Sequence, residues 1–243
     1  DLAQRVTVYG KLPLPGLIIS TPPHLLPKDE QNKVLPVDQL AIDCGLPYDE
    51  IKELVSLGDR ALFRYAPEKL AGTRVSAPYL DNSAGAAAAI WAAKLAKDAG
   101  KTPPRVILTV QEEVGGRGAR TAAFPEEIKT VIAVDTTFAA APGVSDEESA
   151  PLGSGARIGF APVLDFALSK RLVSAAEANG IPYTVEVMGR STGTDADDAG
   201  IIGSGRVTGL ISIPIRNMHT PVEVAELGDI EAAARLISEI IRN

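Results

Sequence analysis

One stretch, residues 106–118, organises the rest of this sequence and reads VILTVQEEVGGRG. Its first part, residues 106–110, is short, apolar and β-branched, which predicts a buried strand. The glycine-rich part, residues 115–118, predicts a loop whose backbone bends sharply or lets another group approach closely. Glu112 and Glu113 should then lie at the carboxyl end of a core strand, where open α/β sheets bind their ligands. Two acids there need a cation or a proton to compensate their charge.

Composition narrows the class of protein. The chain has 243 residues with 45% hydrophobic residues, enough to form a sizeable core. A net charge of −7 without a basic run argues against a nucleic-acid partner. No apolar run approaches the about 18 residues that span a bilayer, so no membrane partner is expected. Cys44 is the single cysteine, which fits a reducing compartment, and a cytoplasmic location is expected.

Two regions differ in their patterns. Residues 1–74 contain short β-type runs separated by turn signals, with one helical segment at 49–55, and this predicts a small β-rich domain. The four expected strands are residues 5–9, 16–20, 39–43 and 61–65.

Residues 75–243 alternate between strand and helix patterns, beginning with an alanine-rich helix at 82–99. This alternation predicts an α/β domain with a mainly parallel sheet sandwiched by helices. Ile90 and Trp91 on that first helix are expected in the core. The further expected strands are residues 106–110, 131–134, 183–187 and 207–213, and the further expected helices are 165–179 and 229–242.

Acidic and histidine residues recur just past the apolar runs. Asp81 opens the long helix, the Glu112-Glu113 pair follows residues 106–110, Asp135 follows 131–134, and His219 follows 207–213. In a parallel sheet these side chains would converge at one edge. Carboxylates with one imidazole suit zinc, cobalt or manganese, and a free carboxylate beside the metal can take a proton from water.

Each of these residues also has a purely structural interpretation. Asp81 can cap its helix, Asp135 can be a turn residue, His219 can lie on the surface or in a satisfied core position, and one acid of the pair can face away. Thr194 or Asp195, in the polar loop 190–198, can cap a short helix or lie beside a substrate.

The run from Gln111 to Ala119 resembles the glutamyl aminopeptidase and tetrahedral aminopeptidase family of dinuclear metallopeptidases, whose members often carry the label cellulase or endoglucanase. Further motifs in the same order support the resemblance along almost the whole chain. They are Pro22-Pro23-His24-Leu25, Ile42-Asp43-Cys44-Gly45, Asp81-Asn82, Ala133-Val134-Asp135, Gly193-Thr194-Asp195-Ala196 and Met218-His219-Thr220-Pro221.

The resemblance implies a role for each motif residue. Asp81 would bridge two divalent metal ions. Glu113 and His219 would complete the ligand set of one ion, and Asp135 would hold the other. The ions would be Zn or Co, with Mn as a further possibility. Glu112 would be the general base in the removal of an N-terminal residue from a peptide. The resemblance also implies homo-oligomers, namely tetrahedral dodecamers, in which residues 1–74 form an apical oligomerisation domain.

One departure concerns the second ion. The family has a further ligand in a His-x-Asp pattern ahead of its apical domain, whereas this sequence has two histidines, His24 and His219. His24 belongs to a different motif and is expected to be structural. The opening strands of the catalytic domain are therefore expected to be missing here, and the ion held by Asp135 is expected to be weakly bound.

Two alternatives follow from these patterns. One is a catalytically impaired paralogue or a fragment that keeps the fold and the assembly role. The other is a glycoside hydrolase, which would use two carboxylates. Adjacent residues of one strand point to opposite faces, so Glu112 and Glu113 would not easily flank one glycosidic bond.

Overall fold

A computed structural model describes residues 2–29, 33 and 35–241. The chain forms two compact units, Asp1–Ala66 and Pro67–Asn243. Residues 67–74, which the sequence patterns placed with the first region, belong to the second, because β5 (Glu68–Lys69) and β6 (Arg74–Ala77) pair within its sheet. No helix in the described part of the chain is long and apolar enough to cross a membrane.

The first unit is built on a four-stranded antiparallel sheet in the order β3-β2-β1-β4. One face carries a small core of Val6, Val8 and Leu14, with side chains of helix α1 packed against it. The four predicted strands and the predicted helix are confirmed, with ends shifted by a few residues. The elements are β1 (Arg5–Tyr9), β2 (Pro13–Ile19), η1 (Pro23–Leu25), η2 (Val37–Gln39), β3 (Ala41–Asp43), α1 (Tyr48–Leu54) and β4 (Arg60–Phe63).

The second unit has a sheet in the order β5-β6-β11-β10-β8-β9, with β7 paired to the other side of β10. The α/β class is confirmed, and the sheet is mixed: β7 with β10 and β8 with β9 are parallel, whereas the other pairs are antiparallel. The remaining strands are β7 (Thr130–Phe138), β8 (Ala156–Phe160), β9 (Tyr183–Val187), β10 (Val207–Arg216) and β11 (Glu223–Glu226).

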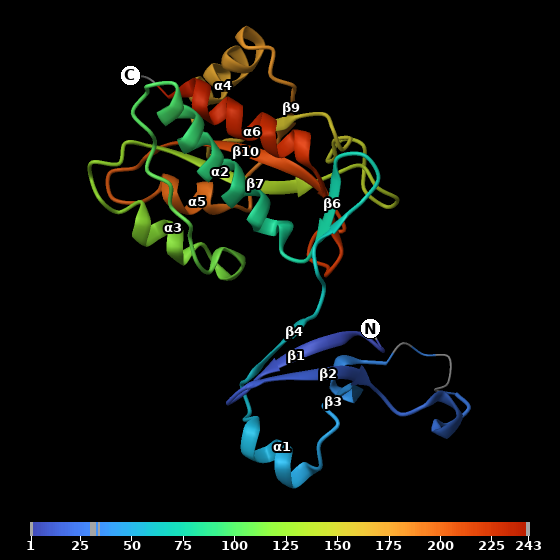
Figure 1. The fold of residues 1–243 in the computed structure, drawn as a ribbon. Coiled ribbons are helices and arrows are strands. Elements are labelled where there is room, and N and C mark those ends of the chain that lie inside the picture. The colour runs from blue at the N-terminus through green and yellow to red at the C-terminus, as the bar shows by residue number, and fades with distance from the viewer. Residues whose placement is uncertain (1, 30–32, 34, 242–243) are drawn as a thin grey trace. The chain divides into compact units, whose positions relative to one another are not determined.

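Helices cover both faces of this sheet. Ile211, Ile213 and Ile215 of β10 point into a core shared with α2, α4 and α6, whereas Leu210 points to the opposite side with Ala196 of α5. Figure 1 shows α2 and α6 side by side over the sheet. The helical segments are α2 (Leu80–Asp98), η3 (Glu112–Val114), α3 (Arg117–Ala122), α4 (Phe166–Ala178), α5 (Asp195–Gly200) and α6 (Leu227–Ile240).

Three expectations are wrong. Residues 106–110 form no strand, because no described strand lies beside them to complete their hydrogen bonds, and Leu108 is 60% exposed. Asp135 lies within β7 rather than after it, since the strand continues to Phe138. Ile90 and Trp91 are exposed, because the buried stripe of α2 consists of smaller residues such as Ala88 and Ala92.

Candidate metal centre

Three of the predicted ligands meet in space. Asp81, Glu113 and His219 each present one ligand atom, and these atoms lie within 4.8 Å of one another. The imidazole Nε2 of His219 lies 3.1 Å from Asp81 Oδ2 and 3.5 Å from Glu113 Oε2. We call these residues the ligand trio. Imidazole nitrogen and carboxylate oxygen are zinc ligand atoms, and catalytic zinc sites use three protein ligands and leave a further position open.

The backbone around the trio adopts an uncommon conformation. Among the described residues, five that are not glycine have a positive φ, and four of them adjoin or belong to the site. Such conformations cost energy in L-residues and concentrate at functional sites, where surrounding contacts hold them. The four are Tyr79 (62°), Gln111 (62°), Asn217 (57°) and His219 (62°).

Asn82, rather than Asp81, serves as the cap of the long helix. Asp81 and Asn82 have non-helical φ and ψ angles, and regular α2 begins after them. The Asn82 Oδ1 accepts a hydrogen bond from the Gly85 N–H at 2.9 Å, as an N-cap side chain does. The Asn82 amide also donates to the Val134 carbonyl at 2.8 Å and to Asp135 Oδ1 at 2.9 Å. The Asp81 carboxylate is thus left available to face His219.

Asp135 lies deeper than the trio and is not part of it. Its side chain is buried, and Oδ1 accepts from Asn82 and from the backbone N–H of Thr136 at 2.8 Å. Burial raises the pKa of Asp135 to about 8, and the charges of Asp81 and Glu112 add to the rise. A carboxyl group that is this hard to ionise would gain strongly from a nearby cation.

Glu112 and Glu113 occupy different environments although they are adjacent. Both lie on the short η3 turn, where Glu113 reaches His219. Partial burial raises the pKa of Glu112 to about 7, with further contributions from Glu113 and Asp195. Burial and Asp81 also raise the pKa of Glu113, while His219 opposes the rise. A carboxyl with a pKa near neutrality is suited to accept and return a proton.

The loop before α5 places a third partly buried acid, Asp195, near the site. The Thr194 hydroxyl accepts from the Ala196 N–H at 3.2 Å, so Thr194 caps α5. Asp195 Oδ2 accepts from the Thr109 hydroxyl at 2.6 Å, whereas its buried Oδ1 has no hydrogen-bond partner in the described part of the chain. Burial raises the pKa of Asp195, and its charge acts on Glu112.

Sequence patterns missed two residues that hold the site together, Asn82 as the link to Asp135 and Glu223. Glu223 lies on β11, a short strand that was not predicted because it follows Pro221 and carries glutamates at both ends. Its buried carboxylate accepts from the backbone N–H groups of Asp81 and His219. A sequence signal existed in the alternation of Val222 and Val224 around a polar residue.

Known proteins share this fold. A TET aminopeptidase from a marine sediment Thaumarchaeota archaeon aligns over 100% of this chain and 70% of its own, with a TM-score of 0.87 and 28% identity. The TET1 peptidase of Pyrococcus horikoshii, which can assemble into a tetrahedron or a large octahedral shell, aligns over 98% of this chain and 72% of its own, with a TM-score of 0.80 and 31% identity. The structure therefore has the fold of the TET peptidases.

Sequence comparison identifies the family. The M42 glutamyl aminopeptidase family matches residues 2–236, and the chain belongs to that family. The lysyl aminopeptidase of Pyrococcus furiosus is 32% identical over 230 residues, which cover 93% of this chain and 66% of that enzyme. This chain spans slightly less than two thirds of the length of two curated relatives, 65% of a putative aminopeptidase of Acetivibrio thermocellus and 66% of the Pyrococcus furiosus enzyme.

Proposed function

We propose that this chain is the body of a metal-dependent aminopeptidase that removes N-terminal residues from peptides. The observation that carries the proposal is the convergence of Asp81, Glu113 and His219 from three distant segments, in a chain of the M42 family. Uncommon backbone conformations adjoin this convergence, and such conformations concentrate at functional sites.

The ligand trio fits a divalent ion such as zinc or cobalt. Its donor atoms are of the right types and are close enough to bind one ion after small side-chain adjustments. Asp81 and Asp135 would hold a second ion, and that ion would be held less firmly. When bound, such an ion supplies a Lewis acid for the scissile carbonyl and lowers the pKa of water.

Glu112 is the proposed general base. Its carboxyl is partly recessed beside the trio, and its pKa of about 7 in the absence of metal shows an environment that balances its two protonation states. A neighbouring cation would favour the ionised form, which accepts a proton from the attacking water. Glu112 then returns that proton to the amine that leaves the cleaved peptide bond.

The loop that carries Thr194 and Asp195 is the proposed substrate-side wall. Asp195 is an acid whose charge acts on Glu112, and the free amino group of a peptide is a cation that would match this charge. Thr194 contributes by capping α5 and so fixing the position of Asp195.

Metal binding and turnover should be measured together. Cobalt titration by calorimetry, followed by release of nitroaniline from aminoacyl-p-nitroanilides, should show one firmly held ion and metal-dependent turnover. Chelation should remove both, and His219→Ala is the matched control. Firm metal binding without turnover on any of these substrates would instead support a catalytically impaired paralogue. Hydrolysis of carboxymethyl cellulose that survives chelation would overturn the peptidase proposal in favour of a glycoside hydrolase.

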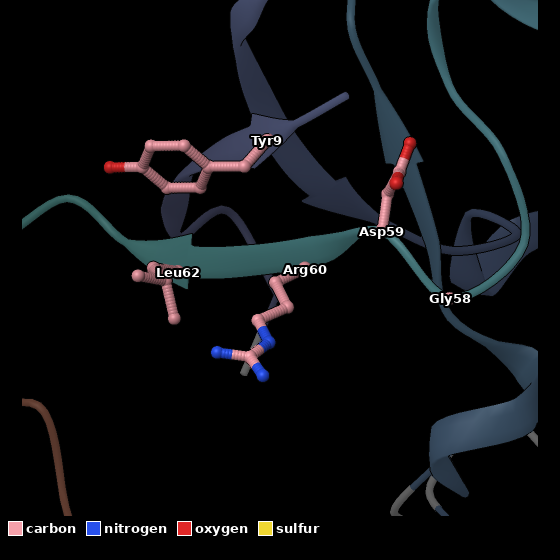
Figure 2. Close-up of a pocket in the computed structure, with 5 residues that line it drawn as sticks. All are labelled: Tyr9, Gly58, Asp59, Arg60 and Leu62. Atoms are coloured by element: carbon pink, nitrogen blue, oxygen red, sulfur yellow. The ribbon is translucent and has the colours of Figure 1, made fainter. Parts of the chain in front are cut away.

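The first unit is the proposed oligomerisation domain. The outer face of its sheet exposes large apolar side chains, with Tyr9 at 47%, Leu17 at 48% and Leu62 at 40% exposure. These residues share one face, because Leu17 pairs with Arg5 and Leu62 pairs with Thr7. Figure 2 shows Tyr9 and Leu62 beside Arg60 at a shallow pocket on this unit. A second copy of the chain would cover such a face.

Light scattering after gel filtration tests the assembly. Wild-type protein should form a large homo-oligomer, with a tetrahedral dodecamer as the expected form. Leu17→Lys should yield smaller species with unchanged cobalt binding, because the charge lies on the exposed apolar face. Leu57→Lys, at an exposed turn, is the control. A monomeric wild type would refute this part of the proposal.

A further inference from the structure

Glu223 is a buried acid beside the ligand trio but does not belong to it. Its side chain lies on β11 between β6 and β10, and the residue is only 2% exposed. One carboxylate oxygen, Oε2, accepts from the backbone N–H of Asp81 at 3.0 Å. The other, Oε1, accepts from the backbone N–H of His219 at 2.8 Å.

A buried carboxylate in this place is costly. Removing a charged group from water disfavours it, and Glu223 also adds negative charge next to Asp81 and Glu113, where its charge helps raise the pKa of Glu113. An apolar side chain would avoid both costs. The benefit has to come from the two N–H groups, which are strong donors to an ionised acceptor.

These two N–H groups belong to ligand residues that are far apart in the chain. Asp81 precedes the regular part of α2, and His219 lies in the turn between β10 and β11. His219 has a positive φ, and the Asp81 backbone is non-helical, so neither N–H enters a regular ladder or helix. Glu223 satisfies both and ties the two segments together.

We propose that Glu223 is a positioning residue that sets the spacing between Asp81 and His219, so that both side chains can bind one ion with Glu113. This inference rests on the proposed metal site. A carboxylate is required because it offers an acceptor to each N–H group, whereas the amide of a glutamine offers one oxygen and would turn an N–H donor towards the second N–H.

The same chain contains a matched control for this chemistry. Asp229 at the start of α6 is also fully buried and accepts from two backbone N–H groups, those of Gly153 at 2.8 Å and Gly155 at 2.7 Å. Asp229 thus does the same structural work, but it contacts no residue of the ligand trio. Any effect of Glu223 beyond that of Asp229 reports on the site.

The first measurement is cobalt affinity by calorimetry, together with the visible absorption spectrum of bound cobalt, in Glu223→Gln and Asp229→Asn. Glu223→Gln should bind cobalt about 10–100-fold more weakly and with a changed spectrum, as is typical when an outer-shell partner is lost. Asp229→Asn should lower thermal stability to a similar degree and keep the wild-type affinity and spectrum. Equal cobalt affinity in wild type and Glu223→Gln would overturn the inference.

Glu223→Asp covers the case in which Glu223→Gln does not fold. It keeps both acceptor oxygens but withdraws them by one methylene, so its cobalt affinity should fall between those of wild type and Glu223→Gln. Unchanged affinity and an unchanged spectrum in Glu223→Asp would count against a positioning role.

Hydrogen exchange in the metal-free protein separates this inference from the metal proposal. The amides of Asp81 and His219 should be protected in wild type and should exchange faster in Glu223→Gln or Glu223→Asp, but not in Asp229→Asn. If wild type binds no cobalt, the metal site fails and these amides still decide whether Glu223 joins the two segments. Fast exchange of both amides in wild type would refute the link.

Discussion

The ligand trio and the recessed acids lie side by side, yet their environments differ. Asp81, Glu113 and His219 combine carboxylates with an imidazole, and the His219 and Glu113 side chains are 64% and 59% exposed. Glu112, Asp135 and Asp195, which we call the recessed acids, are more buried than Glu113 and His219, and burial raises their pKa values, with neighbouring carboxylates adding to the rise.

This difference explains how neighbouring carboxylates can perform separate tasks. The His219 imidazole opposes the rise in the pKa of Glu113, and the two side chains together can bind a cation. A recessed carboxylate among other acids exchanges protons near neutral pH. Environment, rather than residue type, therefore separates Glu113 from Glu112, although the two are adjacent on η3.

The largest expected effect comes from replacing each of the two adjacent glutamates with glutamine. Glu112→Gln should lower kcat by about 10²–10⁴-fold while the firmly bound ion remains, because it removes the proton acceptor and keeps the ligands. Glu113→Gln should lose the ion first. Nitroanilide assays and cobalt calorimetry on both variants make the measurement. Loss of metal in Glu112→Gln with retention in Glu113→Gln would reverse the assignment.

Removing the His219 imidazole tests whether the ligand trio binds the metal ion. His219→Ala should weaken binding of the firmly held cobalt ion by more than about 100-fold, because loss of a ligand costs more than loss of an outer partner. His24→Ala, in the first unit, should leave the affinity unchanged. Calorimetry gives both values, and an unchanged affinity in His219→Ala would exclude the trio as the metal site.

The recessed acids should make the metal-free protein less stable as the pH rises. The pKa of folded Asp135 is about 8, above its value of 3.8 in an unfolded chain. Between these values the folded state holds a proton that the unfolded state has released, so the free energy of unfolding falls with increasing pH. Asp135→Asn should flatten this decline, which amounts to a few kcal/mol because one pKa unit equals about 1.4 kcal/mol.

Urea denaturation from about pH 5 to about pH 8.5 measures this decline. Asp98→Asn, which affects only an exposed ion pair with Lys94 on α2, is the control and should keep the wild-type slope. The same slope in wild type and Asp135→Asn would show that Asp135 does not cause the decline. Added cobalt should reduce the slope if the cation favours the ionised form.

The smallest expected effect concerns the support of the recessed acids. Thr109→Val removes the hydroxyl that donates to Asp195 and leaves that carboxylate without its partner, which should lower the free energy of unfolding by about 1–3 kcal/mol. Thr121→Val is the control, because its hydroxyl is exposed and bonds only to helix carbonyls, and it should change stability by less than about 0.5 kcal/mol. Chemical denaturation distinguishes the two.

Local patterns predicted most of the elements. β1 and β9 match their predicted ranges, because alternating or β-branched residues bounded by glycine or proline signals define them. The prediction of a strand at residues 106–110 was wrong because a strand needs a neighbouring strand to complete its hydrogen bonds, and the local sequence pattern does not show whether one is present. The prediction that Ile90 and Trp91 lie in the core was wrong because α2 packs against the core through alanine, which leaves the larger side chains exposed.

The convergence of Asp81, Glu113 and His219 was predicted because each follows an apolar run, although the run before Glu113, residues 106–110, forms no strand. The supporting residues were not predicted, because Asn82 and Glu223 act through hydrogen bonds to backbone groups 52 and 142 residues away. Nothing in the identity of an asparagine or a glutamate indicates which distant backbone group it will bind.

The hydrogen bonds of Asn82 have a consequence for the order of folding and metal binding. They link the start of α2 to the Val134 carbonyl and to Asp135 of β7, so an ordered position of the Asp81 carboxylate depends on the docking of helix and strand. A nascent chain that still lacks β7 would offer an ion no organised set of donors. Metal acquisition would therefore follow folding and act as a checkpoint, since a binding ion selects chains whose distant segments are already assembled.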